Sequence, residues 1–180
     1  CRHDDGDAVG GELAEGRGGA GLDRIRNGDN ANDVAGMGNE QAGSTGDGFP
    51  AIRANIVAND ITLDPAGNLY MAGDYGGRVR KVTLDGIIQT IAGHEQRGFC
   101  GDGGSALEAC FDTPAAIAAD AAGNVYISDS QNHRVRMVNP AGIIATIAGN
   151  GQQVLEGDGL PAAQSSLGSP RDLALDGAGN

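Results

Sequence analysis

Polar and apolar residues alternate with a period of two along short stretches of the chain, and polar or glycine-rich turns separate these stretches. Residues 133–138 alternate in the order His-Arg-Val-Arg-Met-Val, and residues 124–129 form a β-rich run, Asn-Val-Tyr-Ile-Ser-Asp. Alternation predicts β-strands because successive side chains of a strand point to opposite faces. The expected strands span residues 61–64, 69–72, 78–83, 87–92, 116–120, 124–129, 133–138, 143–148 and 172–176.

The same pattern returns at a fixed step along the chain. The triplet Ala-Gly-Asn stands at 66–68, 122–124 and 178–180, which is a step of 56 residues each time. A long repeat of this kind indicates supersecondary units that depend on their neighbours for stability. Four short antiparallel strands per unit are typical of propeller blades. We therefore expect an all-β fold, a partial β-propeller that forms an open arc of about three four-stranded blades.

The repeat also divides the chain into segments. Residues 1–21 are rich in Gly and Asp and are expected to be disordered, and residues 22–55 are expected to form a degenerate blade remnant and a long loop. Residues 56–114 and 115–170 each correspond to one blade plus a long loop, and residues 171–180 to the first strand of a truncated blade. We expect exposed strand edges, and we expect the remaining blades to belong to the same polypeptide.

Composition narrows the range of partners. The chain carries a formal net charge of −12, with 24 acidic and 12 basic residues. Nucleic acid is therefore a poor partner, because binding phosphates requires a basic surface, and anionic membrane surfaces are disfavoured for the same reason. No run of apolar residues approaches the ~18 needed to span a bilayer. We expect neither nucleic-acid binding nor membrane insertion.

A Gly-Asp-Gly loop follows the last strand of each copy, at residues 46–48, 101–103 and 157–159. Residues 101–106 also fit a dinucleotide-binding fingerprint, but no βαβ unit surrounds them, and a loop present in every copy is most simply structural. Asp47, Asp102 and Asp158 are weak candidates for Ca²⁺ ligands. Ca²⁺ takes six to eight oxygen ligands, and one carboxylate per loop is too few unless neighbouring blades contribute. We assign no cofactor-binding and no metal-binding residue beyond these candidates.

Two cysteines flank one of these loops. Cys100 and Cys110 stand where the next copy has Glu156 and Ser166, so both depart from the repeat together. They are candidates for a local disulfide, which would stabilise the fold by about 2–3 kcal/mol on the chain-entropy model and would favour an oxidising compartment. The alternative is two free thiols, and a Cα separation beyond about 7 Å would exclude the bond.

The other reactive side chains form no catalytic pattern. His3, His94 and His133 make no spaced metal motif with cysteine, and no catalytic residue is assigned. Three aspartates recur beside the Ala-Gly-Asn triplet, which favours a structural turn: Asp64, Asp120 and Asp176. Arginines spaced two apart share one face of a strand, which we expect to be a solvated outer face with cross-strand ion pairs or, alternatively, a stripe that binds a partner: Arg78, Arg80, Arg134 and Arg136.

These motifs resemble the NHL-repeat family. The resemblance rests on the stretches at 122–129, 132–136 and 147–151 and on the recurring Gly-Asp-Gly loops, and it covers residues 34–180 well and 22–33 poorly. It implies a β-propeller, commonly six-bladed, that serves as an interaction scaffold. Long-loop repeats of this type are similar to those of bacterial envelope or secreted proteins.

One copy departs from this pattern. Gly76 and Gly77 stand in place of Asn132 and His133, and the aspartate that matches Asp129 falls one position later, at 74. Related propellers include a few enzymes, such as peptide-amidating lyases and lactonase-like hydrolases. Other members of the family bind RNA through a basic face, which this acidic chain does not offer.

We therefore expect a non-enzymatic propeller segment that acts as a scaffold for a protein, peptide or carbohydrate ligand, outside the cell or in its envelope. Features present in every copy are most simply scaffold, so individual function is expected where the repeat is broken. One alternative is a fragment of a propeller lyase or hydrolase with a metal in the central channel. Another is the sensor ectodomain of a larger signalling protein.

Overall fold

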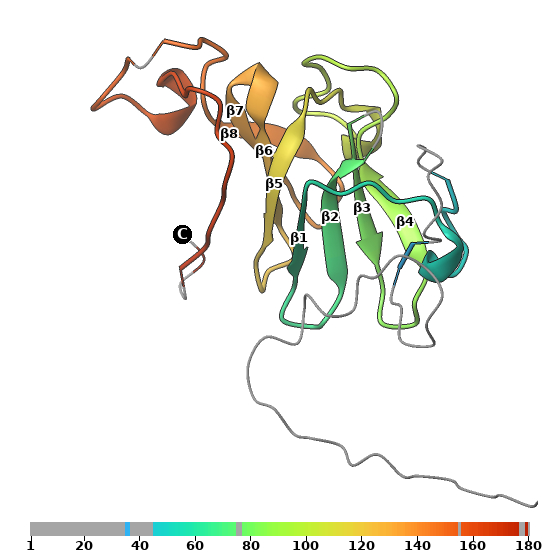
Figure 1. Ribbon diagram of the computed structural model, residues 1–180. Helices are drawn as coiled ribbons and strands as arrows, with labels where there is room; N and C mark the ends of the chain where they lie inside the picture. Colours follow the sequence, from blue (N-terminus) through green and yellow to red (C-terminus); the bar gives the residue numbers. More distant parts are fainter. Residues whose placement is uncertain (1–34, 37–44, 75–76, 155, 177–178, 180) are drawn as a thin grey trace, which may run out of the picture.

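Two four-stranded antiparallel sheets stand side by side in the computed structural model, which describes residues 35–36, 45–74, 77–154, 156–176 and 179 (Figure 1). The strands of each sheet are hydrogen-bonded in sequence order, as in a propeller blade. The first sheet consists of β1 (Asp60–Leu63), β2 (Leu69–Asp74), β3 (Arg78–Val82) and β4 (Ile88–Ala92). The second consists of β5 (Pro114–Ala119), β6 (Val125–Asp129), β7 (Arg134–Val138) and β8 (Ile144–Ala148).

Helical structure among the described residues is limited to short 3₁₀ turns in the loops. These turns are η2 (Ala51–Arg53), η3 (Ala106–Glu108), η4 (Ser130–Asn132) and η5 (Ala162–Gln164). In this part of the chain no helix has the length and apolar character that a membrane crossing needs.

The all-β fold class and the strands of the two central copies are confirmed. The degenerate copy and the N-terminal segment lie largely outside the described residues. The strand expected at 172–176 is wrong, since these residues follow an irregular path. A strand needs a neighbour to complete its ladder of hydrogen bonds, and no described strand pairs with this segment.

The copy that departs from the repeat does so through a β-bulge. The register of β2 against β3 shifts between Ala72 and Asp74. Gly73, between them, has a φ of 99°, a conformation that favours glycine. One extra residue in β2 therefore explains why Asp74 falls one position after the place of Asp129.

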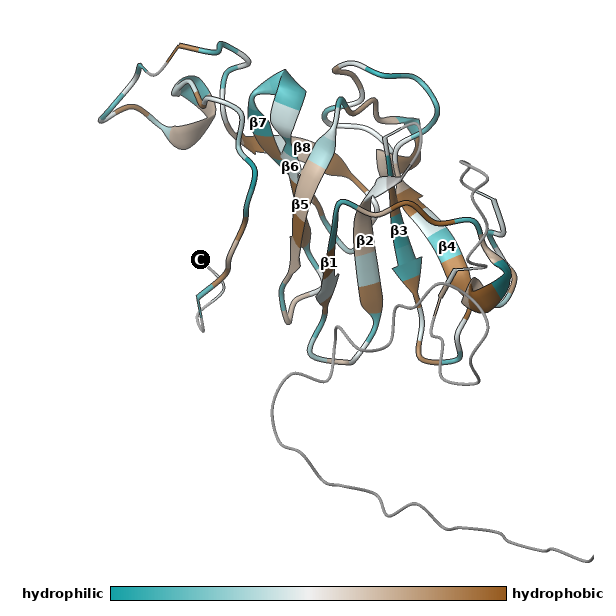
Figure 2. Cartoon of the chain, in the orientation of Figure 1, coloured by the Kyte–Doolittle hydropathy of each residue, from teal (hydrophilic) through white to brown (hydrophobic). Residues whose placement is uncertain are grey.

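Small aliphatic side chains from both sheets fill the space between the blades. The interface buries Tyr70 and Val79 from the first sheet and Ile117 and Ile127 from the second, with Phe111 of the connecting loop fully buried among them. Figure 2 shows hydrophobic stretches on β2, β4 and β5. Because each blade hides one face of its neighbour, neither sheet is an independent unit.

The recurring aspartates form the structural turns that the repeat predicts. Asp64 accepts hydrogen bonds from the backbone N–H of Asn68 at 2.9 Å, from its side-chain amide at 2.7 Å and from the Tyr70 hydroxyl at 3.1 Å. Asp120 has the same partners one copy later. Partial burial opposes the charge, but these hydrogen bonds outweigh it and hold the pKa of each carboxyl below its ordinary value.

Candidate functional site: the cleft between the blades

A buried arginine anchors each blade to the loop that precedes it. The guanidinium of Arg136, on β7, donates to the carbonyl oxygens of Cys100 and Cys110, both at 2.7 Å. It also donates through Nε and Nη2 to one carboxylate oxygen of Asp102, at 3.0 and 2.7 Å. The other oxygen of Asp102 accepts from the backbone N–H and the hydroxyl of Thr146 on β8. The Gly-Asp-Gly loop is therefore hydrogen-bonded to the last two strands of the next blade, β7 and β8.

The first blade has the same anchor. Arg80, on β3, donates to the carbonyl oxygens of Thr45 and Asn55 at 3.2 Å and to Asp47 at 2.6 Å. We call Arg80 and Arg136 the anchor arginines, and both side chains are fully buried. The expectation of a solvated arginine face is thus wrong for these two residues, because the preceding loop folds over that face and supplies the polar partners that a buried charge requires.

The outer arginines of the two pairs lie nearer to solvent. Arg78 pairs with Glu95 at 3.2 Å, and Glu95 is largely exposed. Arg134 donates to the carbonyl oxygens of Asn132 and Asn150 and lies 3.9 Å from the centroid of the Phe99 ring. These two side chains are half-buried rather than fully solvated, and the ion pair of Arg78 reaches the loop after β4 instead of a neighbouring strand.

The loop aspartates proposed as weak Ca²⁺ candidates lie apart, on separate blades. Asp47 and Asp102 are each bound to an anchor arginine, and Asp158 is exposed in the third loop. Burial opposes the charge of Asp47, but hydrogen bonds from Thr90 and Arg80 hold its pKa below the ordinary value. A cation would have to displace the guanidinium of Arg80 or Arg136, so Asp47 and Asp102 are poorly placed as ligands.

Cys100 and Cys110 are joined by a disulfide that closes the loop around Arg136, with their Cα atoms 4.9 Å apart. This separation lies within the range that a disulfide spans. His94 Nε2 lies 3.8 Å from Cys110 Sγ, and His94 Nδ1 accepts the backbone N–H of Gln96. Among the described residues, these are the only three His, Cys, Asp or Glu side chains close enough to share a metal. In the disulfide form neither sulfur is available as a thiolate ligand.

A second acidic residue supports the anchor of the second blade. Asp129, at the end of β6, is fully buried with its carboxylate 3.6 Å from Nη1 of Arg136. It accepts hydrogen bonds from the backbone N–H of Asp112 and from the side chain of Asn132. Burial raises the pKa of Asp129 to about 6, although these hydrogen bonds and Arg136 favour the charged form.

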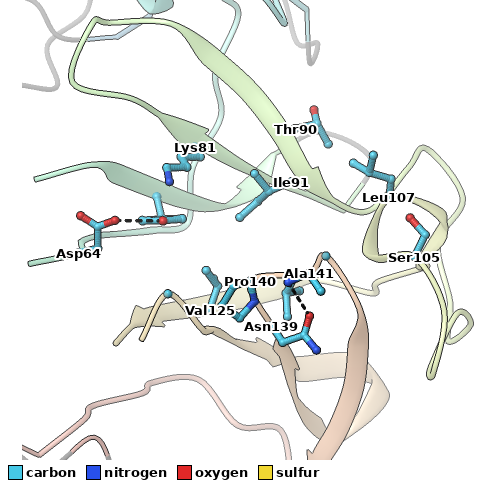
Figure 3. Close-up of a pocket in the computed structure, with 14 residues that line it drawn as sticks. Asp64, Lys81, Thr90, Ile91, Ser105, Leu107, Val125, Asn139, Pro140 and Ala141 are labelled. Carbon is cyan, nitrogen blue, oxygen red and sulfur yellow. Dashed lines mark hydrogen bonds between the residues drawn. The ribbon is translucent and has the colours of Figure 1, made fainter. Parts of the chain in front are cut away.

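A cleft of about 520 Å³ opens between the two blades, at the end where the β5–β6 and β7–β8 turns lie (Figure 3). One wall comes from the first blade and includes Lys81 and Ile91, and the opposite wall comes from the second blade and includes Val125 and Pro140. Leu107 of the connecting loop lies at one end and is 51% exposed. This concave space is lined by both aliphatic and polar side chains and has the size of small-ligand sites.

Lys81 is the one cationic residue of this lining. Its ammonium nitrogen lies 5.1 Å from the centroid of the Tyr70 ring. Asp64 also lines the cleft, but Asn68 and Tyr70 occupy its carboxylate. No hydrogen bond or ion pair links Lys81 to another described residue, so its three N–H donors are available to a ligand or to water.

Sequence reasoning did not select this residue, although a signal was present. Lys81 is the only lysine in the chain, and the next copy has Met137 at the same repeat position. It therefore belongs with the departures from the repeat at which individual function is expected. The cleft itself could not be found from sequence, since its walls come from residues 64–91, 105–107 and 123–142, which only the fold brings together.

The tandem four-stranded blades, each anchored to its neighbour by a repeated loop, define the chain as a segment of a β-propeller. Residues 96–165 match the family model described as the teneurin NHL domain. This match covers the second blade and parts of the loops on either side of it, the region that carries the motifs resembling NHL repeats.

Solved structures from Bacteroides have a similar fold. A protein of Bacteroides thetaiotaomicron described as an auxiliary nutrient binding protein is 18% identical over 66% of this chain and 32% of its own length, with a TM-score of 0.50. A protein of unknown function from the same organism is 28% identical over 59% of this chain and 26% of its own, with a TM-score of 0.48. This chain therefore spans about a third or less of the length of the structures it matches.

Proposed function

We propose that the chain is part of a non-enzymatic NHL-repeat propeller that serves as an interaction scaffold, with the cleft between the blades as its ligand site. The observation that carries this proposal is the cleft of about 520 Å³, lined by aliphatic and polar side chains and by a lysine that makes no hydrogen bond or ion pair with the described residues. The ligand classes that fit are a peptide, a segment of a protein or a carbohydrate.

Three further observations support a binding role. The anchor arginines and loop aspartates, the most prominent charged residues of the repeat, are used to hold the blades together. Asp64 and Asp120, which a channel metal of a lyase or hydrolase would recruit, each accept three hydrogen bonds from their own turn. One solved structure with this fold is described as a nutrient binding protein, in line with a binding role here.

We place this function outside the cell or in the cell envelope. The support is the disulfide between Cys100 and Cys110, since such bonds persist in oxidising compartments and are rare in the cytosol. A ligand site in that location would be reached by peptides and oligosaccharides from the surroundings.

A ligand screen with two matched variants tests the proposal. Leu107→Asp places a charge at the mouth of the cleft, whereas Ile52→Asp changes the same loop position in the preceding copy, where the side chain is 49% exposed and lies outside the cleft lining. Pools of short peptides and oligosaccharides are added to the full chain, and binding is followed by amide chemical shifts. We expect a ligand that Leu107→Asp weakens at least tenfold and Ile52→Asp leaves unchanged. Binding lost equally in both variants, or retained in both, contradicts the cleft as the site.

A further inference from the structure

We propose that the cleft binds the carboxyl-terminal end of a peptide whose last residue is aliphatic, with Lys81 binding the carboxylate. This inference rests on the proposed function and names the ligand class of the same site. It follows from three features of the cleft: the position of its cation, the chemistry of its walls and the occupation of its acidic group.

The cation provides the charge complementarity. Lys81 is half-buried on β3, and Figure 3 shows its nitrogen directed into the space between the blades. The Tyr70 ring lies beneath the ammonium and supports the positive charge without supplying a hydrogen-bond acceptor. A carboxylate would supply acceptor oxygens for the N–H groups of the ammonium. The resulting charge-assisted hydrogen bond is stronger than a neutral one.

The acidic residue of the cleft, Asp64, attracts this cation through space but makes no hydrogen bond or ion pair with it. Both carboxylate oxygens of Asp64 accept hydrogen bonds from Asn68 and Tyr70. Asp120 accepts the equivalent hydrogen bonds in the next copy, where a methionine stands in place of the lysine. The turn therefore has the same geometry with and without a lysine beside it. Lys81 is an addition to the scaffold at this position, so the repeat does not need it for folding.

The walls offer an aliphatic side chain a set of apolar contacts. Ile91, Leu107, Val125 and Val138 line the space, together with polar residues that include Thr90 and Ser105. The carboxamide oxygen of Asn139 is already used by the backbone N–H groups of its own turn. A sugar ring carries hydroxyl groups on most of its carbons, and burying them against aliphatic walls would leave them without partners. A leucine or valine side chain would lose no hydrogen bond there.

The negative net charge of the chain favours ligands with a single carboxylate over ligands with many negative charges. A net charge of −12 repels anions at long range, but salt screens that repulsion beyond about 8 Å at physiological ionic strength. A ligand that combines one carboxylate with an apolar side chain makes both of its contacts inside the cleft. A polyanion would meet the acidic surface around it.

The test compares one tripeptide in two forms. Glycyl-glycyl-leucine is titrated into the full chain as the free acid and as the carboxamide, with a neutral malto-oligosaccharide and an oligogalacturonate as further probes. Calorimetry is repeated with Lys81→Met, which installs the residue of the next copy, and with Lys81→Arg, which keeps the charge. Circular dichroism verifies that both variants fold.

We expect the acid to bind at least tenfold more tightly than the amide, Lys81→Met to abolish this difference and Lys81→Arg to retain it. Equal binding of acid and amide overturns the inference and leaves the proposed function standing, provided Leu107→Asp still weakens both. If either carbohydrate binds more tightly than the tripeptide and Leu107→Asp weakens that binding, the inference is likewise overturned and the proposed function stands. If none of the probes binds in a Leu107-dependent manner, the peptide inference is wrong and the cleft as a ligand site fails with it.

Discussion

At the residue scale, the anchor arginines show how a charged group becomes part of a β-propeller core. Arg136 is fully buried, yet every direction of its guanidinium meets a carbonyl or carboxylate oxygen, and the rings of Phe99 and Phe111 lie about 5 Å away. Taking a charge out of water is costly, and only a complete set of partners offsets that cost. We call the loop and its oxygen atoms that surround an anchor arginine the cradle. The cradle is therefore sensitive to the loss of any one of these hydrogen-bond partners.

Replacing Arg136 by methionine is expected to lower the free energy of unfolding by about 3–5 kcal/mol, since the change removes the cation that pairs with Asp102 and Asp129 and the donor to two carbonyl oxygens. The control is Arg134→Met, two positions away on the same strand, where the side chain is only half-buried and the cost should be about 1 kcal/mol or less. Urea denaturation measures both. Similar losses for the two variants would contradict the assignment of Arg136 as the anchor.

Asp129 predicts a specific pH dependence. Burial raises its pKa from 3.8 to about 6, so the folded state binds a proton more readily than the unfolded state between these values. Its contribution to stability is then fully present below pH 3.8 and is lost as the pH rises through about 6. The stability of the wild type relative to Asp129→Asn, measured by denaturation from pH 4 to pH 7, should fall as the pH rises. A difference that stays constant or grows with pH would be inconsistent with the raised pKa.

At the element scale, one loop geometry is closed in three different ways. The ends of the first loop meet through a backbone bridge between Thr45 and Asn55, and those of the second through the bridge and disulfide between Cys100 and Cys110. In the third, the backbone N–H and the hydroxyl of Ser166 both donate to the carbonyl oxygen of Glu156 at 2.9 Å. The cradle for an anchor arginine thus needs the loop ends close together, and the disulfide is one means of holding them.

Replacing both cysteines by serine is expected to reduce stability by about 2–3 kcal/mol without abolishing the fold, because the first blade has the same cradle with no disulfide. The measurement is urea denaturation of the double variant against the wild type. Reduction of the wild type by a dithiol should give the same loss and should leave the double variant unchanged. Complete unfolding of the double variant would show that the backbone bridge alone cannot close this loop.

The sequence predicted most of the elements but misplaced the arginines. Period-two alternation and the 56-residue step gave both sheets, and the recurrence of Asp64 and Asp120 gave their turns. Spacing alone placed Arg80 and Arg136 on the correct face of their strands but could not show what covers that face. The covering loop lies 25 to 36 positions earlier in the chain, so its contact with the arginine depends on tertiary structure.

At the scale of the whole molecule, the blades are coupled through a shared interface. Phe111 belongs to the loop between them, is fully buried among side chains of both sheets and lies 5.0 Å from the guanidinium of Arg136. A repeat protein of this kind draws its stability from contacts between units as well as within them. The cleft belongs to the same arrangement, since residues of both blades line it beside the β5–β6 and β7–β8 turns.

Phe111→Ala is expected to cost about 3–5 kcal/mol, because it removes a large side chain from the centre of this interface. Hydrogen exchange should show that amides of β2–β3 and of β6–β7 lose protection together, since both sheets contact the same ring. The control is Phe99→Ala, where the ring is 44% exposed and the effect on both sheets should be small. Loss of protection in one sheet alone would show that the blades unfold independently.

The most direct test of the account is the response of Lys81 itself to a ligand. It is the only lysine in the chain, so reductive methylation with ¹³C-formaldehyde gives one side-chain signal beside that of the N-terminal amine and preserves the charge. We predict that the free-acid tripeptide shifts this signal in a saturable manner, whereas its carboxamide leaves it nearly unchanged. A Lys81 signal that stays still while the acid binds would place the ligand elsewhere and contradict the assignment of the cleft as the functional site.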